Sequence, residues 1–99
     1  MAEHPLSIFE KVDADLLKLV KEGREFALAD GALPKRIKLL IAMTLDAAHG
    51  TVQGVKSLTQ QAIQAGASKE EIMEALRVAH YICGAGCVHT AANAFKEIF

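Results

Sequence analysis

The segment from Gly66 to Ile72 constrains the fold most, because it ends one helix and begins the next within a few residues. Gly66 can adopt the left-handed backbone conformation that closes a helix without a Cβ clash. Ser68 can accept a hydrogen bond from the backbone N–H of Glu71 while the Glu71 side chain bonds back, an arrangement known as the capping box. The segment therefore predicts two helices that meet at a fixed angle.

The rest of the sequence is also compatible with helices, and no segment alternates apolar and polar residues as a half-buried strand does. We predict an all-α fold and a single domain over residues 1–99, without a long repeat or a linker. Asp13 is expected to cap a helix inside the first segment, and residues 35–48 should form the most buried helix. The predicted helical segments are 6–26, 34–49, 51–65, 68–83 and 87–98, the last being either separate or a bent continuation of the one before it.

Charge and hydropathy exclude two classes of partner. The formal net charge is −1 and the signs are dispersed, so no basic stripe is available to bind nucleic acid or an anionic membrane. The longest strongly apolar stretch, around residues 39–45, is far shorter than the roughly 20 residues of a membrane span. No targeting signal is recognised at the N-terminus. We therefore expect a cytoplasmic protein.

Two cysteines, Cys83 and Cys87, lie too close together in sequence to join distant parts of the fold, so they do not indicate a secreted disulfide framework. Apolar residues make up 52% of the chain. Because a domain of this size cannot bury that much apolar surface alone, we expect a homo-oligomer that assembles through a helical face.

From Leu39 to the C-terminus, the arrangement of elements resembles the carboxymuconolactone decarboxylase family, which includes the alkylhydroperoxidase AhpD-like proteins. The resemblance lies in an Ala-rich central helix, the turn at Gly66 and Ser68, the helix that follows, and the small-residue segment 84–86. It implies an AhpD-like helical bundle that assembles into trimers, hexamers or similar rings.

The peroxidase branch of this family carries two cysteines three residues apart, a histidine one turn later and a glutamate on the preceding helix. In this sequence, the resemblance aligns these four positions with Thr51, Gly54, Leu58 and Leu39. Neither a threonine nor a glycine supplies a thiolate. The resemblance therefore implies that the thiol peroxidase mechanism does not operate at this site, whereas the decarboxylase branch needs only acid-base groups and a cation for the carboxylate.

His49 is the main acid-base candidate, because it lies at the predicted junction of two helices, where the resemblance places the pocket. An imidazole can act as a general acid or as a general base. Alternatively, His49 caps its helix C-terminus through the helix dipole. Arg77 is the cation that we would test as a carboxylate anchor, and its alternative role is an ion pair on its own helix.

The C-terminal third contains the other candidates. Cys83 and Cys87 could form a relocated redox pair, with Cys87 activated near a helix N-terminus, or they could pack as small hydrophobic residues. Together with His80 and His89 they could offer nitrogen and sulfur ligands, but the spacing matches no common zinc module. We therefore predict no metal and no cofactor.

Three functional hypotheses follow. The first is acid-base chemistry on a small-molecule substrate, of the decarboxylase or lactone type, in a pocket near His49 with His80 or His89 contributing. The second is peroxiredoxin-type thiol redox activity through Cys83 and Cys87. The third is a non-enzymatic oligomeric protein that binds a ligand or serves as a scaffold.

Overall fold

One short 3-10 helix and six α-helices follow one another along residues 4–99, the part of the chain that the computed structural model describes. No strand occurs in these residues, so the predicted all-α class is confirmed. None of the helices is both long and apolar enough to cross a bilayer. In order, the elements are η1 (Pro5–Ile8), α1 (Phe9–Val12), α2 (Ala14–Leu28), α3 (Lys35–His49), α4 (Val52–Gln64), α5 (Lys69–Cys83) and α6 (Ala85–Phe95).

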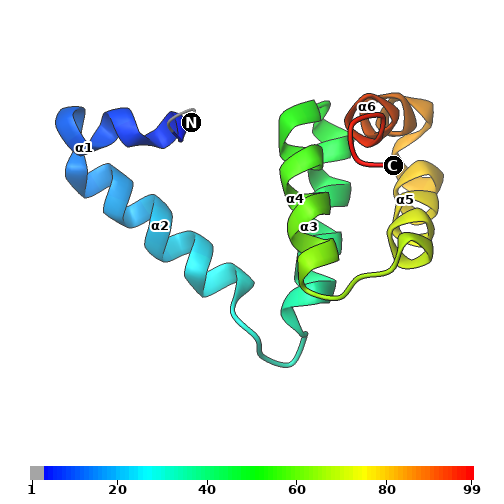
Figure 1. The fold of residues 1–99 in the computed structure, drawn as a ribbon, viewed down its shortest axis with the longest axis horizontal. Helices are drawn as coiled ribbons and strands as arrows, with labels where there is room; N and C mark the ends of the chain where they lie inside the picture. Colours follow the sequence, from blue (N-terminus) through cyan, green and yellow to red (C-terminus); the bar gives the residue numbers. More distant parts are fainter. Residues whose placement is uncertain (1–3) are drawn as a thin grey trace.

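Helices α3 to α6 form a bundle in which α3 packs against α4, α5 and α6 (Figure 1). Leu39 and Met43 of α3 are fully buried, as expected for the central helix. Many of the core residues contributed by the other helices are small, which allows the helix backbones to approach closely and fill the interior densely. These core residues include Val55, Ala62, Ile72, Leu76, Ala79, Cys87, Ala91 and Ala94.

Residues 5–28, comprising η1, α1 and α2, form an N-terminal arm that extends away from the bundle (Figure 1). The Asp13 carboxylate accepts a hydrogen bond from the backbone N–H of Leu16 at 3.0 Å, which confirms the predicted cap inside this segment. Leu17 is the one buried residue of α2, whereas the side chain of Phe26 is 89% exposed. Within one chain, the arm therefore leaves much of its apolar surface uncovered.

The junction between α4 and α5 has the predicted caps. Gly66 has a φ of 100°, and the Ser68 hydroxyl accepts the backbone N–H of Glu71 at 3.0 Å. A carboxylate oxygen of Glu71 in turn accepts the backbone N–H of Ser68 at 2.9 Å and pairs with Arg36 of α3. The bond from Ser68 and, next, the Arg36 guanidinium hold the pKa of the Glu71 carboxyl below its ordinary value. These contacts join the start of α5 to α3.

Helices α5 and α6 are separate, because Gly84 adopts a φ of 84° that ends the helical path after Cys83. Helix α6 starts at Ala85, two positions before the expected start at Cys87, and ends at Phe95 rather than at Ile98. The thiol of Cys87 therefore lies inside the first turn of α6 and not at its N-terminal boundary.

Candidate functional site

His49 is the last residue of α3, and Gly50 closes the helix with a φ of 79°. The chain then turns directly into α4, and the backbone N–H of Thr51 donates to the carbonyl of Asp46 at 2.9 Å. The imidazole of His49 is exposed, at the C-terminal end of the helix, where a protonated ring interacts favourably with the helix dipole. The α3–α4 turn thus presents this histidine to solvent.

Asp46 precedes His49 by three residues, and its carboxylate faces α4. A Cβ built on Gly54 would overlap this carboxylate and would lie 3.1 Å from the Cγ2 methyl of Thr51. Asp46 is half-buried, and its position three residues before His49 places both side chains on neighbouring parts of the α3 surface. The α3–α4 turn therefore carries Asp46, His49 and Thr51 within six residues of sequence, with the Asp46 carboxylate facing Gly54.

The sequence placed Asp46 near His49, as a carboxylate that could orient it, but not among the catalytic candidates, although one further signal for it was present. Gly54 interrupts an otherwise amphipathic helix, where glycine costs about 0.5–1 kcal/mol relative to alanine. Its backbone φ lies outside the left-handed region, so backbone geometry does not require glycine there. The structure supplies the reason, because the missing side chain leaves space for the Asp46 carboxylate.

His80 lies on α5 and lines a surface groove of about 450 Å³ with Met73, Leu76, Arg77 and Val88. This groove is formed by α5 and α6, and His49 does not line it. His80 and His49 therefore belong to different surface features of the chain.

The two cysteines differ in their surroundings. Cys83 is exposed at the end of α5, whereas Cys87 is 2% exposed and its thiol donates to the Gly84 carbonyl at 3.1 Å. A ring nitrogen of His89 lies 3.0 Å from the carbonyl of Ala85 in the same helix. In residues 4–99, no group of three or more His, Cys, Asp or Glu side chains is arranged to hold a metal ion.

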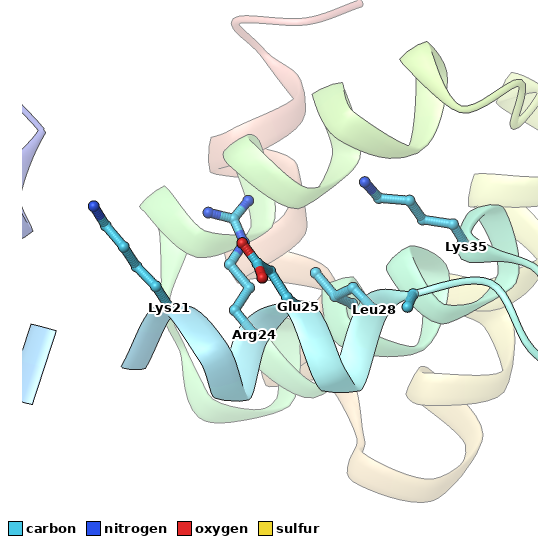
Figure 2. Close-up of a pocket in the computed structure, with 6 residues that line it drawn as sticks. Lys21, Arg24, Glu25, Leu28 and Lys35 are labelled. Atoms are coloured by element: carbon cyan, nitrogen blue, oxygen red, sulfur yellow. The ribbon is translucent and has the colours of Figure 1, made fainter. Parts of the chain in front are cut away.

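A second and larger groove, of about 510 Å³, lies along the arm where α2 approaches the start of α3 (Figure 2). Three of its side chains are basic, and Arg24 donates to the amide oxygen of Gln61 in α4 at 2.8 Å. No residue that the sequence predicted for the site lines this groove, because it combines segments that only the packing of the arm brings together. Its lining residues are Lys21, Arg24, Glu25, Leu28, Ala29 and Lys35.

Comparison with known proteins identifies the family. No curated protein matches the sequence. Among solved structures, the chain is similar to the crystal structure of an apo carboxymuconolactone decarboxylase family protein from Legionella pneumophila, with a TM-score of 0.86 and 32% sequence identity over 92% of this chain and 81% of that one. The model of the carboxymuconolactone decarboxylase family matches residues 14–97. The chain therefore belongs to the carboxymuconolactone decarboxylase family.

Proposed function

We propose that this protein catalyses an acid-base reaction on a small carboxylic acid, of the decarboxylase or lactone type, at the α3–α4 turn. The observation that supports this proposal is the position of the Asp46 carboxylate, which occupies the space over Gly54. His49 supplies an imidazole that can accept or donate a proton, and Asp46 orients or polarises it. Thiol chemistry plays no part in this proposal.

The residues at the turn favour acid-base chemistry over the peroxidase mechanism of the family. At the positions that resemble the redox motif, Thr51 and Gly54 carry no thiol, and Leu58 cannot transfer a proton. Leu39, at the position of the glutamate, is fully buried in the apolar core. Asp46 and His49 are the ionisable side chains of the turn.

A second copy of the chain is part of this proposal. His49 lines neither of the two grooves described above, and in this proposal a partner subunit completes a pocket around it. Large apolar side chains are available for such an assembly, because they are exposed on the arm and on α5. They are Val12, Leu19, Val20, Phe26, Val78, Tyr81 and Ile82.

Assembly is tested by light scattering after size-exclusion chromatography. We expect a trimer or a hexamer, and Phe26→Asp should lower the measured mass because it places a charge on an 89%-exposed aromatic position. Lys18→Asp, on the same helix, is the matched control and should leave the mass unchanged. A monomer in the unmodified protein would contradict this part of the proposal.

A cytoplasmic location completes the proposal. Cys83 and Cys87 are both free thiols, which persist in reducing compartments. Cell fractionation with a cytoplasmic marker tests the location, and recovery in an oxidising compartment would contradict it.

Turnover is tested by a screen of unsaturated lactone acids and 3-oxo acids. The reaction is detected as release of carbon dioxide or as loss of the lactone absorbance. Asp46→Asn and His49→Ala should each lower kcat by about a hundredfold or more, the range of general acid-base catalysis. His4→Ala is the control, because it removes a histidine from the start of the arm. If no substrate is turned over and His49→Ala binds ligands as the unmodified protein does, the acid-base proposal is contradicted and the non-enzymatic hypothesis is the one that remains.

A further inference from the structure

The groove between α5 and α6 combines an apolar floor with one arginine and one histidine. Helices α5 and α6 lie on the side of the bundle away from the arm (Figure 1), and the groove between them is lined by Met73, Leu76, Arg77, His80 and Val88. Its volume of about 450 Å³ falls within the roughly 300–1,000 Å³ that is typical of small-molecule sites. No acidic residue lines the groove.

Arg77 has no anionic partner in the described chain, although acidic residues are close to it in sequence. Glu74 precedes it by three positions, at a spacing that commonly forms an ion pair on a helix. The ion pairs of residues 4–99 are nevertheless formed by other side chains, so the guanidinium stays available at the groove. These pairs are Lys18–Glu22, Arg36–Glu71 and Lys56–Glu97.

The arrangement fits an anion that also carries an apolar body. A guanidinium presents parallel N–H donors that match the two oxygens of a carboxylate. His80, one turn after Arg77, lines the same groove and can donate a further hydrogen bond. The apolar side chains of the groove, those of Met73, Leu76 and Val88, can cover methylene groups but provide no hydrogen bond or opposite charge for a second anionic group. This favours a monocarboxylate over a phosphate or a dicarboxylate.

We infer that the α5–α6 groove binds a free aliphatic monocarboxylate, with Arg77 holding the carboxylate and Met73, Leu76 and Val88 covering the chain. This site is separate from the α3–α4 turn and does not depend on the acid-base proposal. His80 acts there as a binding residue that orients the carboxylate.

Isothermal titration calorimetry with decanoate below its micelle concentration tests this inference, and decanol is the uncharged comparison. Decanoate should bind more tightly than decanol. Arg77→Leu should weaken decanoate binding by about tenfold, the effect of losing a charged hydrogen-bonding partner, and should leave decanol binding unchanged. Arg24→Leu is the matched control, because it removes an arginine that lines the other groove.

A second variant keeps the test decisive if Arg77→Leu does not fold. Val88→Glu places a carboxylate at the edge of the groove, where it should pair with Arg77 and exclude decanoate. Equal affinities for decanoate and decanol would overturn the inference, as would decanoate binding that neither groove variant weakens. Equal weakening by Arg24→Leu and Arg77→Leu would also overturn it, because binding would then follow net charge and not this groove.

Discussion

Replacement of Gly54 by alanine separates the steric role of this position from its helix propensity. The added Cβ would overlap the carboxylate of Asp46, so the aspartate side chain must rotate away from α4. The backbone of Gly54 is already compatible with an L-residue, since its φ is not positive. We therefore expect Gly54→Ala to move the Asp46 carboxylate while the helix stays intact.

The expected change in stability is the sum of two opposing effects. Alanine in place of glycine inside a helix stabilises the fold by about 0.5–1 kcal/mol. Forcing a side chain such as Asp46 away from its preferred rotamer costs about 0.5–1.5 kcal/mol. The free energy of unfolding should therefore change by less than about 1 kcal/mol, whereas the proposed activity at the α3–α4 turn should fall as far as we expect for Asp46→Asn.

Urea denaturation followed by far-ultraviolet circular dichroism at a fixed protein concentration measures this change. Gly23→Ala in α2 is the matched control, because nothing lies within 4 Å of the added Cβ and the full helix gain should appear. In an Asp46→Ala background, Gly54→Ala should show the full helix stabilisation of alanine over glycine. The double-mutant cycle should therefore give a coupling energy of about 1 kcal/mol between positions 46 and 54. A coupling energy of zero, or unchanged turnover in Gly54→Ala, would refute the reasoning.

Four further predictions concern stability and thiol reactivity. Ser68→Ala removes one half of the capping box and should lower the free energy of unfolding by about 1 kcal/mol in urea denaturation. The pKa of Glu71 is lowered in the folded state, so its stabilising contribution is present above its unfolded pKa and is lost as the pH falls through the folded pKa. Glu71→Gln should therefore weaken the dependence of the melting temperature on acid pH. An unchanged dependence would contradict this. Thr59→Val should raise the free energy of unfolding by about 1 kcal/mol, because the Thr59 hydroxyl is fully buried and has no hydrogen-bond partner among residues 4–99. A loss of stability would contradict this. Iodoacetamide should label the exposed Cys83 quickly and the buried Cys87 only on unfolding, as measured by mass spectrometry. Rapid formation of a reversible disulfide after addition of an organic hydroperoxide would instead support the thiol redox hypothesis.

Local signals in the sequence predicted much of the fold. The caps at Asp13, Gly66 and Ser68 depend on hydrogen bonds to residues within a few positions, so the sequence contains both partners of each bond. The same locality explains the turn at His49 and Gly50, where one left-handed glycine ends α3. These caps, whose partners are close in sequence, were therefore predicted correctly.

Features that depend on contacts between distant segments were not predicted. The apolar pattern of the arm does not predict that α2 extends away from the bundle, because the same residues could equally be buried in a hydrophobic core. The groove of Arg77 and Val88 joins two helices whose angle is set by the backbone of Gly84. The start of α6 was also misplaced, since Gly86 was expected to lie at its boundary and in fact lies inside it.

The Asp46 carboxylate occupies the space that a side chain at position 54 would need, and the resemblance assigns a redox cysteine of the family to that position. A cysteine at position 54 would bring a Cβ that overlaps the Asp46 carboxylate, so the two side chains exclude one another in the present backbone. Installing cysteines at positions 51 and 54 would therefore displace Asp46 and place a carboxylate close to the new thiols. A nearby negative charge raises the pKa of a thiol and disfavours the thiolate that peroxidase chemistry needs. Thr51→Cys with Gly54→Cys should accordingly gain hydroperoxide reactivity only when Asp46 is also replaced by alanine, and equal reactivity with and without Asp46 would show that the carboxylate does not determine the chemistry of this turn.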